Sequence, residues 1–394
     1  MIVVIVRRTA VAVAASLIGL TASGTASGTA TAAPRAAETV PQSWEYSALR
    51  LAEAHRTAQG EGVTVAVLDS GVEAGHPALA GKVTTGPDYV EDGLQPGDAK
   101  WGDHGTAMAS DVLKVAPKAE ILSIRITNDE DEDEDFYTGT SRVARGIDYA
   151  IEHGADVISM SIGGELLGDS YDEDEADALG RAAQAGVPVL ASAGNSGDEF
   201  NDAQYPAGYP GVIAVAALQQ SGSRAGFSTV RTYNSVAAPG VAIMSAKNTG
   251  GYEAINGTSP ATALTAGVAA LMKSANGKLT SAQVRSILTS TARHASTGPS
   301  PLDGYGMIDA AAAVQSSAKP PTDRTEPIAY KGKEHLATPD GTPKTQHPPL
   351  DTELVTIGGA AAAVGLIMVI GALLTARAAR RRATRARAQR AGRG

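Results

Sequence analysis

Three residues of this chain have the side chains that nucleophilic catalysis by a serine requires: Asp69, His104 and Ser259. The hydroxyl needs a base within hydrogen-bond reach, and the base needs an acid that orients it. Asp69 ends an apolar run, where a buried carboxylate must find a partner. Ser259 precedes a long Ala-rich stretch, and a helix N-terminus there would offer backbone N–H groups to an oxyanion. The sequence therefore favours nucleophilic chemistry at Ser259.

The segments that must position these side chains alternate between strand and helix patterns. Short runs rich in β-branched residues predict strands, and Ala-rich stretches between them predict helices. Apolar strands separated by helices predict an α/β fold, a doubly wound and mostly parallel sheet with helices on both faces. Strands are expected at residues 63–68, 121–126, 157–162, 187–192 and 212–218, and helices near residues 104–113, 141–153 and 173–185 and after Thr258 and Thr280.

Polar or Gly-rich residues follow three of the predicted strands. The first strand ends in Asp69-Ser70-Gly71, the third in Ser161 to Gly164, and the fourth in Ala193-Gly194-Asn195. In a doubly wound sheet, functional groups gather at the carboxyl ends of the strands. We therefore expect these three segments to meet at one edge of the sheet.

Three short motifs resemble the signatures of the subtilisin-like serine proteases, the subtilases. They are Asp69-Ser70-Gly71, His104-Gly105-Thr106 and Gly257-Thr258-Ser259, and they occur in the chain order of that family. The resemblance covers most of residues 60–316 and implies a serine endopeptidase with Asp69, His104 and Ser259 as its triad. It implies an oxyanion hole made by the Asn195 side chain and the backbone N–H of Ser259, and it implies no cofactor for catalysis.

The same resemblance implies where a polypeptide substrate lies. The substrate would add as a strand along one segment, which also walls the first specificity pocket opposite a second segment. The expected substrate-binding residues are Ser161, Ile162, Gly163 and Gly164 on one wall and Ala193 and Gly194 on the other.

The chain departs from the subtilase pattern at three places near the predicted site. Pro260 follows the serine where many relatives carry Met or Phe, and Ala263 stands where relatives usually have Pro. Proline suits the first helical position, so we expect both changes to affect rate and not reaction type. The segment 111–117 after His104 is shorter than in relatives, which predicts a truncated loop and a more open site.

Residues 129–135 form an unbroken run of Asp and Glu after the second predicted strand. One hypothesis is that the run selects basic side chains on the substrate. A structural calcium site is a second hypothesis, because hard cations bind carboxylate oxygens. The third is a solvated charge run without a specific role.

The N-terminus predicts export. Residues 1–32 have the features of a signal peptide: Arg7 and Arg8, an apolar run over residues 9–20, and an Ala30-Thr31-Ala32 cleavage site. A 33–59 extension then leads into the 60–316 peptidase domain. A membrane-inserted, uncleaved start is the alternative, which the short apolar run disfavours.

The C-terminus predicts a membrane anchor. A Pro-rich stalk over residues 317–353 precedes an apolar transmembrane helix at residues 354–375, which is about long enough to cross a hydrocarbon core of ~30 Å. The eight Arg residues of the 376–394 tail favour a cytoplasmic C-terminus. The expected product is a single-pass protein of the cell membrane with its catalytic domain outside.

Composition narrows the classes of function further. The chain has no Cys, which excludes disulfides and thiolate metal sites. Its net charge is −9. Because the Arg residues concentrate at the tail, the body is strongly acidic, which argues against nucleic-acid binding.

A subtilase with a stalk, one span and a basic tail resembles the mycosins, the membrane-anchored proteases of type VII secretion. Secretion components are therefore expected partners, and a non-catalytic scaffold of a secretion complex is the alternative function.

Overall fold

The described part of this computed structural model comprises residues 43–128, 141–163, 172–199, 201–293, 299–323 and 352–391. The predicted signal peptide, most of the stalk, the acidic run at 129–135 and Gly164 lie outside these residues.

Seven parallel strands form the central sheet, in the order β2-β3-β1-β4-β5-β6-β7. The five predicted strands are confirmed, while β2 and β7 at the two edges were not predicted. The strands are β1 (Thr64–Asp69), β2 (Val83–Asp88), β3 (Glu120–Arg125), β4 (Val157–Met160), β5 (Val189–Ser192), β6 (Ile213–Leu218) and β7 (Asn234–Pro239).

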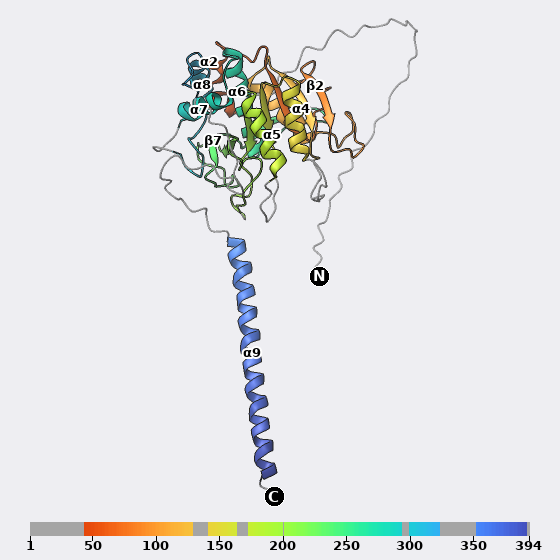
Figure 1. Ribbon diagram of the computed structural model, residues 1–394, viewed down its shortest axis with the longest axis vertical. Helices are drawn as coiled ribbons and strands as arrows, with labels where there is room; N and C mark the ends of the chain where they lie inside the picture. The colour runs from red at the N-terminus through yellow and green to blue at the C-terminus, as the bar shows by residue number, and fades with distance from the viewer. Residues whose placement is uncertain are drawn as a thin grey trace, which may run out of the picture. The chain divides into compact units, whose positions relative to one another are not determined.

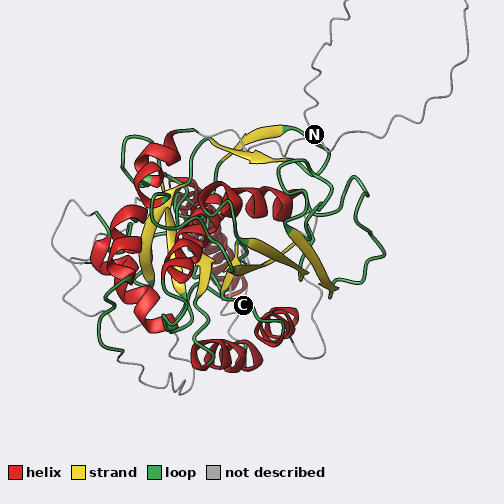
Figure 2. Ribbon diagram, turned by 90° about the horizontal axis from the view of Figure 1, so that it is seen from above, coloured by secondary structure: helices red, strands yellow, loops and turns green. Residues whose placement is uncertain are grey.

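Helices cover both faces of this sheet, as the apolar strands predicted (Figures 1 and 2). Alternate residues of β1 belong to different cores: Val65 and Val67 pack in the cluster that contains α3 and α6, and Ala66 and Leu68 in the cluster that contains α4 and α5. This division follows from the two-residue period of a strand. The four helices are α3 (Asp103–Val115), α6 (Thr258–Ala275), α4 (Arg142–Glu152) and α5 (Glu173–Gln184).

The strand order places a crevice beside β1. The chain runs from β1 to the edge strand β2, returns through β3, and then crosses to β4 on the other side of β1. A change of direction in the strand order leaves a crevice at the carboxyl ends, where ligands of doubly wound proteins bind. The predicted segments after β1, β4 and β5 all lie at this edge.

Smaller elements complete the body. Thr280 and Gln283 form the predicted capping box, in which each side chain bonds the other residue's backbone N–H. Residues 43–58 pack against the body, and Leu49 and Leu51 are fully buried in the core that contains α3. The remaining elements are α1 (Trp44–Ala48), α2 (Leu51–Ala54), α7 (Ser281–Thr291), α8 (Ala310–Ser317) and the antiparallel pair β8 (Ile243–Ala246) and β9 (Tyr252–Ile255).

The C-terminal helix α9 (Thr352–Ala391) is 40 residues long and continuous (Figure 1). Its segment Gly358–Arg377 is long and apolar enough to cross a membrane, by length and composition. This segment overlaps the predicted span at 354–375. The large exposed apolar side chains of the described residues all belong to it: Val364, Leu366, Ile367, Met368, Val369, Ile370 and Leu374.

Candidate active site

Asp69 and His104 form a hydrogen-bonded pair at the carboxyl end of β1. Asp69 is the last residue of the strand and is fully buried, and His104 is the second residue of α3. The Nδ1 atom of His104 lies 2.8 Å from Oδ1 of Asp69, and the backbone N–H of Ser70 donates to the same oxygen at 2.8 Å. A carboxylate only accepts, so Nδ1 carries the proton and Nε2 is the basic nitrogen.

A backbone contact sets the distance between these two residues. A Cβ atom added to Gly105 would lie 2.0 Å from the carbonyl oxygen of Gly71, closer than atoms can approach. The N–H of Gly105 also donates to Oγ of Ser70 at 3.1 Å. The first turn of α3 therefore rests directly on the loop after Asp69, and only glycine at position 105 allows this.

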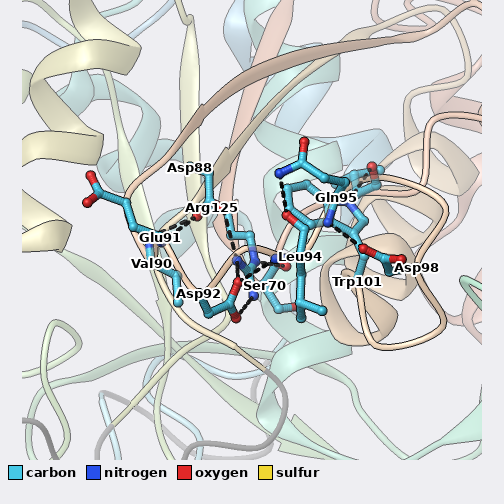
Figure 3. Close-up of polar contacts among 11 residues, drawn as sticks. Ser70, Asp88, Val90, Glu91, Asp92, Leu94, Gln95, Asp98, Trp101 and Arg125 are labelled. Atoms are coloured by element: carbon cyan, nitrogen blue, oxygen red, sulfur yellow. Dashed lines mark hydrogen bonds and ion pairs between the residues drawn. The ribbon is translucent and has the colours of Figure 1, made fainter.

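A buried arginine also holds this loop (Figure 3). Nε of Arg125, at the end of β3, donates to the carbonyl of Ser70 at 3.0 Å, and its Nη atoms pair with Asp88 at 3.0 Å and Asp92 at 2.6 Å. The guanidinium lies 4.8 Å from the ring centre of Trp101. The hydrogen bond from Arg125 holds the pKa of Asp92 down, at about 2. No motif marks this network, although a charged residue inside the predicted strand 121–126 was its signal.

Ser259 lies in the first turn of α6 and is only 9 % exposed. Its Oγ donates to the carbonyl of Ser161 at 3.2 Å, and Oγ of Ser161 donates to the carbonyl of Ser259 at 3.1 Å. These reciprocal bonds tie the helix start to the segment after β4. Backbone N–H groups of a first helical turn have no partner inside the helix, so the N–H of Ser259 is a candidate oxyanion donor.

The helix start differs from the expectation in one respect. Gly257 is the N-cap, which makes Pro260 the third helical residue and not the first. Proline is still accommodated, because the third N–H of a helix has no partner within the helix. Ala263 is fully buried in α6. The truncated loop expected at residues 111–117 is wrong, since α3 continues to Val115 and Asp111 to Val115 are buried within it.

Asn195 is held with its amide group in a defined orientation. It follows β5, and its Oδ1 accepts hydrogen bonds from the backbone N–H of Thr258 at 2.9 Å and from Oγ1 of Thr258 at 3.0 Å. Oγ1 of Thr258 in turn accepts from the N–H of Gly194 at 3.2 Å. Because both bonds to Asn195 use the oxygen, its Nδ2 is the atom that can donate to a ligand.

These side chains line one cleft of about 470 Å³. The cleft brings together Asp69, His104, Ser161, Ile162, Gly163, Gly194, Asn195 and Ser259 from the predicted set, with Thr127, Asn128, Ser192 and Gln204, which were not predicted. Ala193 does not line it: the side chain is fully buried with Ala216, Leu218 and Ala237, beneath the wall that it was expected to form. Gln204 belongs to no motif that marks it as a cleft residue. Its position depends on contacts with Tyr233, Gly163 and Gly194, which the fold brings together.

Within the described ranges, no three His, Asp or Glu side chains gather in a way that could hold a metal ion. The predicted calcium hypothesis concerns residues 129–135, which lie outside those ranges.

An acyl-transfer reaction suits this arrangement chemically. It combines a hydroxyl, an imidazole oriented by a buried carboxylate, and amide donors near the hydroxyl, which are the groups that such a reaction needs. The segment Ser161 to Gly163, where the resemblance led us to expect substrate backbone, lines the same cleft.

Comparison with known proteins shows similarity to subtilisin-like proteases in both sequence and structure. The chain is 36 % identical to thermitase of Thermoactinomyces vulgaris over 284 residues, 70 % of this chain and 92 % of the relative. It is 38 % identical to subtilisin NAT of Bacillus subtilis subsp. natto over 270 residues, 65 % of this chain and 66 % of the relative. The solved structure of the MycP3 protease from the type VII (ESX-3) secretion system matches with 30 % identity and a TM-score of 0.60, over 70 % of this chain and 88 % of that one.

The sequence pattern of the subtilase family matches residues 60–307, well over half of the chain. This range contains every residue that lines the cleft. The protein is therefore a serine endopeptidase with a subtilisin-like fold, and it belongs to the subtilase family.

Proposed function

We propose that Ser259 is the nucleophile of this endopeptidase, His104 its general base and acid, and Asp69 the carboxylate that orients the imidazole. The observation that carries the proposal is the 2.8 Å bond between His104 Nδ1 and Asp69 Oδ1 in the cleft that Ser259 lines. This bond leaves Nε2 to take the proton of the Ser259 hydroxyl. The buried Asp69 then stabilises the imidazolium that forms.

In the first step, Oγ of Ser259 attacks the carbonyl carbon of the scissile peptide bond and its proton passes to His104. The carbonyl becomes an oxyanion, which accepts hydrogen bonds from Nδ2 of Asn195 and the N–H of Ser259. His104 then gives its proton to the leaving amine as the C–N bond breaks. A water molecule then attacks the acyl-enzyme while His104 takes its proton. His104 returns that proton to Oγ as the ester bond breaks, which releases the acid and restores Ser259.

A serine-reactive fluorophosphonate probe and a peptide hydrolysis assay test this assignment. Ser259→Ala should lose both labelling and hydrolysis, because the attacking oxygen is gone. Ser221→Ala, which removes an exposed hydroxyl on another part of the body, is the matched control and should keep both. Labelling that persists in Ser259→Ala would assign the nucleophile elsewhere. A wild-type protein that is neither labelled nor active would favour the scaffold function.

The proposed substrates are exported proteins, and the proposed setting is the outer face of the cell membrane. Three features support this: the signal-peptide pattern of residues 1–32, the apolar segment Gly358–Arg377, and the likeness to MycP3 of a type VII secretion system. Residues 317–353 would be the stalk and residues 376–394 the cytoplasmic tail. Comparison of the culture medium from wild-type and Ser259→Ala cells by proteomics would identify the substrates, and identical profiles would contradict this setting.

Catalysis by this set of side chains uses no cofactor. Three hypotheses stay open for the acidic run at 129–135: a selector of basic substrate side chains, a calcium site, or a solvated charge run without a specific role. Replacing its Asp and Glu residues by Ser separates these ideas: altered cleavage preference supports the first, and loss of calcium-dependent thermal stability supports the second.

A further inference from the structure

Gln204 places a buried amide group in the candidate active site. Its side chain is 2 % exposed and lines the cleft with Ser259 and Asn195. Its backbone N–H donates to Oη of Tyr233 at 3.0 Å, which anchors the residue independently of its side chain. Within the described residues, the Nε2 atom of Gln204 is buried and has no hydrogen-bond acceptor. An amide N–H that remains buried without an acceptor is costly, so this atom points to a ligand group.

The side chain of Gln204 lies between the two glycine walls of the cleft. A Cβ atom on Gly163 would lie 2.7 Å from Oε1 of Gln204, and a Cβ atom on Gly194 would lie 2.3 Å from its Cγ. Both walls therefore touch the glutamine directly, and a side chain at Gly194, whose φ is +107°, would displace it. Gln204 closes the space between the walls and forms the floor of a pocket beside Ser259.

The other polar groups near this floor are already engaged. Oγ of Ser192 donates to the carbonyl of Ile162 at 2.9 Å, and Oγ of Ser161 donates to the carbonyl of Ser259 at 3.1 Å. The charged side chains that line the cleft are Asp69 and His104, which pair with each other. The described lining thus gives the pocket no charge of its own to balance a charged ligand.

We propose that Gln204 is a specificity-determining residue, which selects a carboxamide side chain, Gln or Asn, at the substrate residue whose carbonyl is attacked. An apolar side chain would leave Nε2 buried without an acceptor, and a charged one would lose its hydration without a counter-charge. A primary amide offers both an acceptor and a donor, and so can pair with the amide of Gln204 in full. This inference rests on the proposed function of the same site.

Peptides that differ only at this substrate residue test the proposal. With Gln, Asn, Leu, Glu or Lys at that position, wild-type kcat/KM should be about tenfold higher for the two amides than for Leu, because a site built to hydrogen-bond rejects an analogue that lacks the group. Gln204→Leu should reverse the order of Gln and Leu. Gln204→Glu, which keeps the shape and adds a negative charge, should shift the preference to Lys.

Gln220→Leu is the matched control, since Gln220 is exposed outside the cleft and its loss should leave the profile unchanged. Equal wild-type rates for Leu and Gln, or an unchanged profile in Gln204→Glu, would overturn the proposal even if Gln204→Leu failed to fold. Calorimetric binding of the same peptides to the Ser259→Ala protein needs no catalysis. Selective binding there without wild-type hydrolysis would refute the proposed function alone, and hydrolysis without selectivity would refute this inference alone.

Discussion

At the scale of single residues, Asn195, the proposed oxyanion donor, connects a hydrogen-bond geometry most directly to an expected rate. Thr258 binds its Oδ1 through two donors, at 2.9 and 3.0 Å, so the Nδ2 group is fixed before any substrate arrives. A donor that is already oriented does not have to reorganise as charge develops on the substrate oxygen.

Asn195→Ala should therefore lower kcat while leaving KM little changed. The expected loss is about 10²–10³-fold, the range known for subtilisin itself when its side-chain oxyanion donor is removed. Steady-state kinetics on a peptide substrate would check this, with thermal unfolding as a control for folding. A rise in KM at constant kcat would mean that Asn195 binds the ground state, contrary to the proposed role.

Residues that belong to short motifs were predictable, and residues defined by distant partners were not. The meeting of Asp69, His104, Ser259 and Asn195 in one cleft was predictable, because each ends or follows a strand or lies at the start of a helix within a recognisable segment. Gln204 and Arg125 have no such local signature. Their roles come from contacts with Gly163, Gly194, Ser70 and Asp92, which only the folded sheet brings near them.

At the scale of elements, a buried charge cluster joins α1 to α3, the helix that carries His104. Nζ of Lys114 lies 3.0 Å from Oε1 of Glu45 and 3.0 Å from Oδ1 of Asp111, and it donates to the carbonyl of Met244 at 2.7 Å. All three charged side chains are fully buried. Residues 44–58, which precede the subtilase match, are thus part of the fold that holds α3.

Lys114→Met should destabilise the protein strongly, because it leaves two carboxylates buried without a cation. Removing one partner of a buried pair typically costs about 3–5 kcal/mol. Lys82→Met is the matched control: its pair with Glu120 is exposed, and the expected change is about 0–1 kcal/mol. Urea denaturation of both variants would measure the free energies of unfolding, and equal changes would contradict a structural role for the cluster.

A partly buried carboxyl group, that of Glu175, links the starts of α4 and α5. Oγ of Ser141, the N-cap of α4, donates to Oε1 of Glu175 at 2.6 Å, and Oη of Tyr209 lies 3.0 Å from Oε2. Asp172, the N-cap of α5, bonds the same tyrosine oxygen through its N–H at 2.8 Å. Burial raises the pKa of Glu175 to about 7.

Glu175→Gln should make the protein more stable than wild type at pH 8 and similar at pH 4. With a folded pKa of about 7 against an ordinary value of 4.5, the folded state holds the proton more tightly. Wild-type stability from this group is full below pH 4.5 and is lost as the pH rises through 7, by up to about 3 kcal/mol. Thermal unfolding of both proteins across this range would test it. A difference that does not grow with pH would contradict the raised pKa.

The two strands that sequence reasoning missed are both at sheet edges. β2 contains Gly86 and Pro87, and β7 ends in Pro239. Proline cannot donate to a neighbouring strand, and both residues weaken a strand pattern. An edge strand tolerates them because one of its sides pairs with no other strand of the sheet. The central strands were predictable because burial on both faces makes them continuously apolar.

At the scale of the whole molecule, α9 is the element whose large apolar side chains are exposed and not packed in a core. Seven large apolar side chains of this helix are 48–68 % exposed: Val364, Leu366, Ile367, Met368, Val369, Ile370 and Leu374. Contiguous apolar surface of this kind marks contact with lipid or protein. Among the described residues outside α9, no large apolar side chain is exposed to this extent.

A chain that ends at residue 351 should move from the membrane fraction to the soluble fraction and keep its kcat/KM. The cleft lies within residues 69–259, and none of its lining residues belongs to α9. Fractionation followed by a peptide assay on both fractions would measure this. Retention of the shortened chain on membranes would place the anchor elsewhere.

The composition of the cleft also bears on chemical durability. Pro260 follows the serine, no methionine lines the cleft along the described chain, and the sequence contains no cysteine at all. Peroxide inactivates many enzymes by oxidising sulfur, which turns an apolar thioether into a polar sulfoxide beside the reacting groups. The nearby Met160 is fully buried in β4. The described lining of the cleft therefore presents hydroxyl, imidazole and amide groups to peroxide and no sulfur atom. The enzyme should keep its activity at a peroxide concentration that inactivates a protease with a sulfur atom next to its serine.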